Sequence, residues 1–118
     1  LLVPAGKIVD SIINELKPFI DKQYRTSKSR NDTAVMGSSL GGLITFYLGL
    51  HHSDIFSKIG IISPSFWWGY GEAIKDAKNI NPNLKIWMDM GAKEGQCNCC
   101  THKKNMHITN LRNMKNEL

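Results

Sequence analysis

Residues 33–42 have the sequence TAVMGSSLGG, which joins two different patterns. The first four residues are a short apolar run typical of a buried strand, and an apolar stretch from Leu40 to Leu50 has the length of a helix. The segment therefore predicts a strand that passes through a sharp turn directly into a helix. Within this turn, Gly37, Ser39 and Gly41 have the spacing Gly-x-Ser-x-Gly.

A serine on such a strand-to-helix turn is the position that hydrolases use for a nucleophile. We expect a strained backbone at Ser39, which lifts its hydroxyl above the carboxyl edge of the sheet. Side chains at Gly37 and Gly41 would collide in this turn, and Gly42 would let the helix pack closely. The N–H of Leu40, at the helix start, would point toward a developing oxyanion. The alternatives are an ordinary Gly/Ser connection and a phosphate-binding loop, although the usual glycine-rich phosphate motifs are absent.

Helical and strand-like patterns alternate along the whole chain. Apolar residues recur at helical spacing from Ile8 to Leu16, which predicts a helix that stops or kinks at Pro18. Because apolar strands separated by helices pair in parallel, we expect an α/β fold with a sheet of about three parallel strands, covered by helices on both faces. The length of 118 residues suits one domain. Beyond the serine turn, the patterns predict strands over 58–63 and 84–90 and helices over 71–78 and 103–118.

The composition is that of an ordinary globular protein, with 42% hydrophobic and 21% charged residues. No apolar run approaches the ~18 residues of a membrane helix, and no signal-peptide pattern opens the chain. The net charge of +5 comes from basic clusters within residues 22–30 and 103–115, and neither is interleaved with stacking aromatics in the way that single-strand binders are. We therefore expect a cytoplasmic protein with no membrane or nucleic-acid partner.

Several segments together resemble the putative-esterase family of α/β-hydrolases, which includes esterase D, feruloyl esterases, siderophore esterases and mycolyltransferases. The resemblance runs from about Gly6 to Gly95 and implies a partial α/β-hydrolase fold. It also implies a serine esterase that acts on a small-molecule ester through an acyl-enzyme on Ser39, without a cofactor. The alternatives are an acyltransferase with the same nucleophile and a non-catalytic binding module on the same scaffold. The segments are residues 15–21 (ELKPFID), 35–43 (VMGSSLGGL), 54–56 (DIF) and 63–68 (SPSFWW).

A serine nucleophile needs a base, and the base needs an acid to orient it. In α/β-hydrolases these groups follow the serine in the order acid, then histidine. Asp89, within the last predicted strand, and Glu94, just beyond Gly91, both qualify as the acid. We favour Glu94, because its segment resembles the acid-bearing segment of the family. The structural alternatives are a solvated Glu94 paired with Lys93 and a hydrogen-bonded Asp89 at a strand end.

None of the four histidines suits the role of the base. His51 and His52 lie at the far end of the helix that follows Ser39, about 18 Å away at 1.5 Å per residue. His102 and His107 follow the acid too closely, because a helix and a strand normally separate acid from base in the family. We therefore expect this chain to be the middle-to-late portion of a longer hydrolase, with the base and the second oxyanion donor elsewhere and little activity on its own.

Two further features lie beyond the predicted strands. Trp67 and Trp68 follow the second strand at the edge where open α/β sheets bind ligands, so they would either line the substrate pocket or cover the core. A cluster of three cysteines follows the last predicted strand. Zinc sites usually draw their ligands from two separated pairs, whereas these three cysteines lie within four residues, so we expect an exposed loop and no metal site. The cysteines are Cys97, Cys99 and Cys100.

The edges of the sheet are a further feature. The bare edges of a three-stranded sheet favour pairing between copies, so we expect a homo-oligomer.

Overall fold

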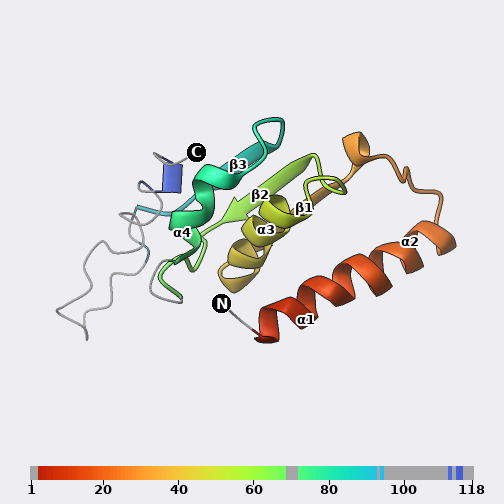
Figure 1. The fold of residues 1–118 in the computed structure, drawn as a ribbon, viewed down its shortest axis with the longest axis horizontal. Coiled ribbons are helices and arrows are strands. Elements are labelled where there is room, and N and C mark those ends of the chain that lie inside the picture. The colour runs from red at the N-terminus through yellow and green to blue at the C-terminus, as the bar shows by residue number, and fades with distance from the viewer. Residues whose placement is uncertain (1–2, 69–71, 93, 95–111, 113, 116–118) are drawn as a thin grey trace.

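The computed structural model describes residues 3–68, 72–92, 94, 112, 114 and 115 (Figure 1). Helices and strands alternate along the described chain. The helices are α1 (Val3–Ser11), α2 (Lys17–Gln23), α3 (Leu40–His51) and α4 (Glu72–Asp76), and the strands are β1 (Ala34–Ser38), β2 (Lys58–Ile62) and β3 (Lys85–Asp89). Three short turns of other helix types complete them: η1 (Ile12–Leu16), η2 (Arg30–Asp32) and η4 (Ala77–Asn79).

The three strands form one parallel sheet in the order β1-β2-β3, which confirms the predicted α/β class. The register pairs Ser38 with Ile62 and Ile62 with Asp89, so the three strands end in one row. Parallel strands bring their carboxyl ends to one edge of a sheet, where ligands of open α/β folds bind. The segments that follow Ser38, Ile62 and Asp89 therefore begin side by side.

The helix α3 forms the centre of the core. Phe46 is fully buried and packs edge-on against Phe66, with ring centroids 5.6 Å apart. On its other side, Leu48 joins Val9 of α1 and Phe56 in a second buried cluster, which attaches the N-terminal helix to the sheet. The main cluster lies between α3, α4 and the sheet and contains Leu43, Phe46, Ile59, Ile61, Phe66, Ala73, Ala77, Leu84 and Met114.

The described helices cover one face of the sheet, and not both as the sequence pattern predicts. Figure 1 shows α3 and α4 on the same side of the strands. On the opposite face, Met36 of β1 is 65% exposed and Trp87 of β3 is 55% exposed. Crossovers between parallel strands are right-handed, so two successive crossovers that step in the same direction leave their helices on one face. The expectation of two covered faces is wrong for the described residues, because the strand order does not reverse within them.

The N-terminal helix continues through Pro18, where the sequence predicts a stop or a kink. A proline inside an α-helix lacks the N–H for its hydrogen bond, and its ring collides with the carbonyl four residues back. Here the preceding turn, η1, is π-helical: the N–H of Lys17 donates to the carbonyl of Ile12, five residues back. This wider turn precedes the proline ring, and α2 runs on to Gln23.

The other elements lie close to their predicted ranges. The helix predicted to end at Leu50 ends at His51, and the helix predicted over 71–78 is completed by η4. Most of the helix predicted over 103–118 lies outside the described residues, although Met114 is buried in the main cluster. Within the part of the chain that is described, no helix is both long and apolar enough to cross a bilayer.

Candidate active site

Ser39 has a backbone conformation that side-chain-bearing residues rarely adopt. It lies between the end of β1 and the first residue of α3, with φ 59° and ψ −120°. A non-glycine residue at positive φ carries a strain of about 1–3 kcal/mol and persists only where the surrounding structure holds it. Ser39 is also exposed. The turn therefore presents its hydroxyl outward at the carboxyl edge of the sheet.

Hydrogen bonds at both ends of its peptide backbone hold Ser39 in this conformation. Its N–H donates to the carbonyl of Ile62, at the end of β2, over 3.0 Å. Its carbonyl accepts from the N–H of Leu43 at 3.2 Å and from the N–H of Ser65 at 3.0 Å. Because two of these bonds come from β2 and the segment after it, the neighbouring strand fixes the strained turn.

Of the two glycines that flank the serine, only Gly37 is sterically required. A Cβ atom at Gly37 would lie 2.3 Å from the carbonyl oxygen of Gly41 and 2.8 Å from Oγ1 of Thr45. A Cβ at Gly41 would meet nothing within 4 Å, so the expectation of a collision there is wrong. The reason is that this position of α3 points into open space. A Cβ at Gly42 would lie 3.2 Å from Cα of Pro64, so that glycine does allow the close packing predicted for it.

The Ser39 hydroxyl contacts a second serine that the sequence analysis did not single out. Its Oγ lies 3.2 Å from Oγ of Ser65, which is almost fully buried. Two residues earlier, Ser63 also has a positive φ, 44°, and its hydroxyl donates to Oε1 of Glu94 over 2.7 Å. Both serines belong to the segment SPSFWW, so its position after β2 was a signal for polar groups as well as for aromatic ones.

The two candidate acids have different surroundings. Oε1 of Glu94 accepts hydrogen bonds from the hydroxyl of Ser63 and, at 3.0 Å, from the N–H of Gly91. The side chain of Asp89 is exposed, and its backbone carbonyl accepts from the N–H of Ser63. Both residues thus lie at the edge that carries Ser39. Lys93, the alternative partner of Glu94, lies outside the described residues.

Most of the remaining predicted residues are distant from the serine turn or outside the described part. His51 ends α3, the helix that begins beside Ser39. Its ring contacts the ring of Tyr47, with centroids 4.2 Å apart. His102, His107 and the cysteine cluster belong to the residues that the structure does not describe. Among the described residues, no group of three or more His, Cys, Asp or Glu side chains could hold a metal ion.

The tryptophan pair lies just beyond Ser65. The rings of Trp67 and Trp68 meet edge-on, with centroids 5.6 Å apart. The two residues are 36% and 42% exposed, whereas the preceding Phe66 is 1% exposed and belongs to the core. Phe66 therefore does the core packing at this point, and both indoles present surface to solvent near the serine turn.

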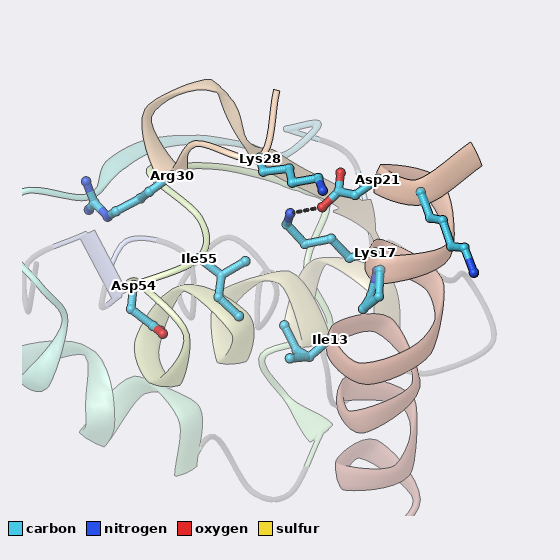
Figure 2. A pocket seen from close by; sticks show the side chains of 9 residues that line it. Ile13, Lys17, Asp21, Lys28, Arg30, Asp54 and Ile55 are labelled. Carbon is cyan, nitrogen blue, oxygen red and sulfur yellow. Dashed lines mark hydrogen bonds and ion pairs between the residues drawn. The ribbon is translucent and has the colours of Figure 1, made fainter. Parts of the chain in front are cut away.

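A cavity of about 430 Å³ lies away from this edge, beside η1 and α2. Figure 2 shows its polar wall, where Nζ of Lys17 contacts Oδ2 of Asp21 at 2.6 Å. The hydrogen bond from Lys17, reinforced by one from Thr26, lowers the pKa of Asp21 below its usual value. None of the residues that line this cavity belongs to the serine turn or to the segment after β2. It is therefore separate from the candidate active site.

Comparison with known proteins identifies the family of the chain. Residues 5–118 match the profile of the family described as "Putative esterase". An uncharacterized Bacillus subtilis protein, YbbA, is 28% identical over 89 residues, which are 75% of this chain and 36% of YbbA. An endo-1,4-beta-xylanase/feruloyl esterase of Xylanibacter ruminicola is 32% identical over 83 residues (70% and 11%), and an Escherichia coli iron(III) enterobactin esterase is 28% identical over 92 residues (70% and 21%).

Solved structures show the same fold. The BES protein from Bacillus cereus superposes with a TM-score of 0.64 at 24% identity, over 75% of this chain and 36% of its own. The siderophore hydrolase EstB from Aspergillus nidulans superposes with a TM-score of 0.59 at 20% identity, over 96% and 42%. The chain spans about a third of the length of the first curated relatives it matches. With its parallel sheet flanked by helices, it has a partial α/β-hydrolase fold and belongs to the putative-esterase family.

Proposed function

We propose that this chain carries the nucleophile of a serine esterase, and that the nucleophile is Ser39. The observation that carries the proposal is the exposed serine at φ 59° and ψ −120°, at the carboxyl edge of a parallel sheet. A backbone strain of this size at a polar residue is typical of functional sites. The family match supports ester hydrolysis as the reaction.

The reaction proceeds in two steps. In the first, Oγ of Ser39 attacks the ester carbonyl carbon and gives its proton to a histidine that lies outside the described residues. The carbonyl oxygen becomes an oxyanion, stabilised by the N–H of Leu40, whose place at the start of α3 adds the favourable end of the helix dipole. The alcohol leaves with the proton from the base. In the second step, water gives a proton to the same base and attacks the acyl carbon. The bond from this carbon to Oγ of Ser39 then breaks, the free acid leaves, and Oγ takes the proton back from the base.

Glu94 is the acid that orients this base. Two donors, the Ser63 hydroxyl and the Gly91 N–H, already hold one of its carboxylate oxygens at the edge of the sheet. A carboxylate that is fixed in place can keep an imidazole in one tautomer and can stabilise the imidazolium that forms during attack. Asp89 lacks such bonds to its carboxylate among those that the structure gives.

The substrate is a small-molecule ester that binds beside the indoles of Trp67 and Trp68. Both side chains are partly exposed within three residues of Ser65, which contacts the nucleophile. Aromatic side chains of this kind supply large apolar contact area, so they suit an apolar or aromatic acyl or alcohol group. The names of relatives that act on feruloyl and enterobactin esters are compatible with this choice.

The test uses the protein expressed from its complete reading frame, with p-nitrophenyl acetate as substrate. Ser39→Ala should reduce kcat by several orders of magnitude, whereas Ser38→Ala, a matched change in the adjacent exposed serine, should leave kcat within about twofold. A fluorophosphonate probe should label the peptide that contains Ser39 and no other. Unchanged turnover in Ser39→Ala, or a label on a different residue, would overturn the proposal; lack of turnover and of labelling in the unmodified protein would favour the binding module.

A further inference from the structure

Ser65 contacts Ser39 twice, through its backbone and through its side chain. Its N–H donates to the Ser39 carbonyl at 3.0 Å, and its Oγ lies 3.2 Å from the Ser39 Oγ. We propose that Ser65 is a positioning residue, whose hydroxyl holds the Ser39 hydroxyl in the orientation for attack. The proposal rests on the function proposed above for Ser39.

The residues around Ser65 are tightly packed. The residue is only 4% exposed and lies between Pro64, which is fully buried, and Phe66, which packs against Phe46 of α3. The close approach of Pro64 to Gly42 fixes the same segment against the start of the helix. A side chain in such a frame has given up its rotamer freedom on folding. It can therefore orient an exposed neighbour at little further cost in entropy.

The chemistry of the two hydroxyls fits this role. A serine hydroxyl has one proton to donate and two lone pairs that accept. When Ser39 donates its proton to the base, its oxygen still accepts a hydrogen bond from Ser65. This bond strengthens as negative charge builds on Oγ during the attack, because hydrogen bonds to charged groups are stronger. In the acyl-enzyme the same oxygen has become part of an ester and accepts only weakly, so the bond is strongest in the transition state for attack, and only this difference accelerates the reaction.

The backbone contact and the hydroxyl contact can be separated by mutation. Ser65→Ala keeps the N–H bond that supports the strained turn and removes only the hydroxyl. Loss of one hydrogen bond of this kind corresponds to about a five- to tenfold fall in rate. We expect kcat to fall by that factor with KM unchanged within about twofold, and the rate constant for fluorophosphonate labelling of Ser39 to fall in parallel. Ser65→Thr, which keeps the hydroxyl, should restore most of both.

A matched control exists at the opposite end of the same strand. Ser57 precedes β2, is also buried, and its hydroxyl donates to the carbonyl of Asn31 at 3.2 Å. The same hydroxyl accepts from Nζ of Lys58 at 3.3 Å. Ser57→Ala therefore removes both side-chain hydrogen bonds of a buried serine far from the turn, and it should leave kcat and the labelling rate unchanged. If Ser65→Ala unfolds, Ser65→Cys takes its place, because the thiol keeps the volume but is a weak donor.

The outcomes separate this inference from the proposal on which it rests. If Ser39→Ala keeps its activity, the nucleophile itself is wrong. If Ser39→Ala is inactive but folded Ser65→Ala, or Ser65→Cys in its place, labels and turns over at the normal rate, only the positioning role fails. Equal losses in Ser65→Ala and Ser57→Ala would also overturn it, because they would indicate a general effect on stability. A selective loss at Ser65, with rescue by threonine, supports it.

Discussion

The two glycines of the serine turn make a matched pair, because alanine should be harmful at one and harmless at the other. At Gly37 a methyl group would lie 2.3 Å and 2.5 Å from backbone atoms of Gly41, whereas ordinary contact begins at 3.4 Å. The β1–α3 connection would have to open by about 1 Å. Overpacking in a well-packed site costs about 1–3 kcal/mol, and we expect the upper end because backbone atoms must move.

At Gly41 the same substitution meets open space in the first turn of α3. Alanine reduces the conformational freedom of the unfolded chain and favours the helix, which is worth about 0.5 kcal/mol of stabilisation. The predicted difference between Gly37→Ala and Gly41→Ala is therefore about 3.5 kcal/mol in the free energy of unfolding. Urea denaturation of the protein from its complete reading frame, monitored by circular dichroism, measures the free energy of unfolding of each variant. We expect equal m-values for the two variants, so that the difference in midpoint reports the difference in stability.

Esterase activity provides a second test of the same two variants. Gly37→Ala displaces the strand end that precedes Ser39, so esterase turnover should fall along with stability, whereas Gly41→Ala should keep nearly full turnover. If Gly37→Ala unfolds at the same urea concentration as the unmodified protein, the steric argument is wrong. If Gly41→Ala is as damaging as Gly37→Ala, the turn is more crowded than the structure indicates.

Two further predictions concern carboxylates. If Glu94 is the acid, Glu94→Gln should lower kcat on the order of 10³- to 10⁴-fold. Ser63→Ala, which removes the hydroxyl that donates to Oε1 of Glu94, should lower kcat about tenfold, whereas Asp89→Asn should change little. The reverse ranking of Glu94 and Asp89 would assign the role to Asp89. At Asp21, the hydrogen bond from Lys17 lowers the folded-state pKa, so the carboxylate adds stability above about pH 4 and this contribution disappears as the pH falls through the lowered pKa. Asp21→Asn should therefore be less stable than the unmodified protein at pH 7 in urea denaturation and no less stable near pH 2; an equal difference at both values would contradict the assigned cause.

The sequence pattern predicts the local elements well, because each depends on neighbouring residues. The strand before Ser39 and the helix after it follow from apolar runs with a glycine turn between them. The passage of the first helix through Pro18 was not predictable in this way, since the π turn at Ile12–Leu16 has no single-residue signature. The freedom at Gly41 depends on what lies opposite a Cβ atom, which no sequence pattern encodes.

The polar contacts of the site could not be predicted for a related reason. Ser39 and Ser65 are 26 residues apart, and Ser63 and Glu94 are 31 residues apart. Both contacts depend on the register that ends β1, β2 and β3 in one row, so a shift of one residue would turn these side chains away. The position of the helices on one face follows from the strand order β1-β2-β3, which is also a property of the assembled sheet and not of any single segment.

The face of the sheet that the described helices leave open also affects how these residues behave in solution. Met36 and Trp87 flank Gly60 in one row of the register, and the side chain of Met36 lies over the glycine, so this row presents two large, exposed apolar side chains. A surface of this kind is attractive to other apolar surfaces and to added strands. Polypeptides cut down to these residues will therefore tend to self-associate during purification, and polar replacements at these two positions are the natural first choice for keeping them in solution.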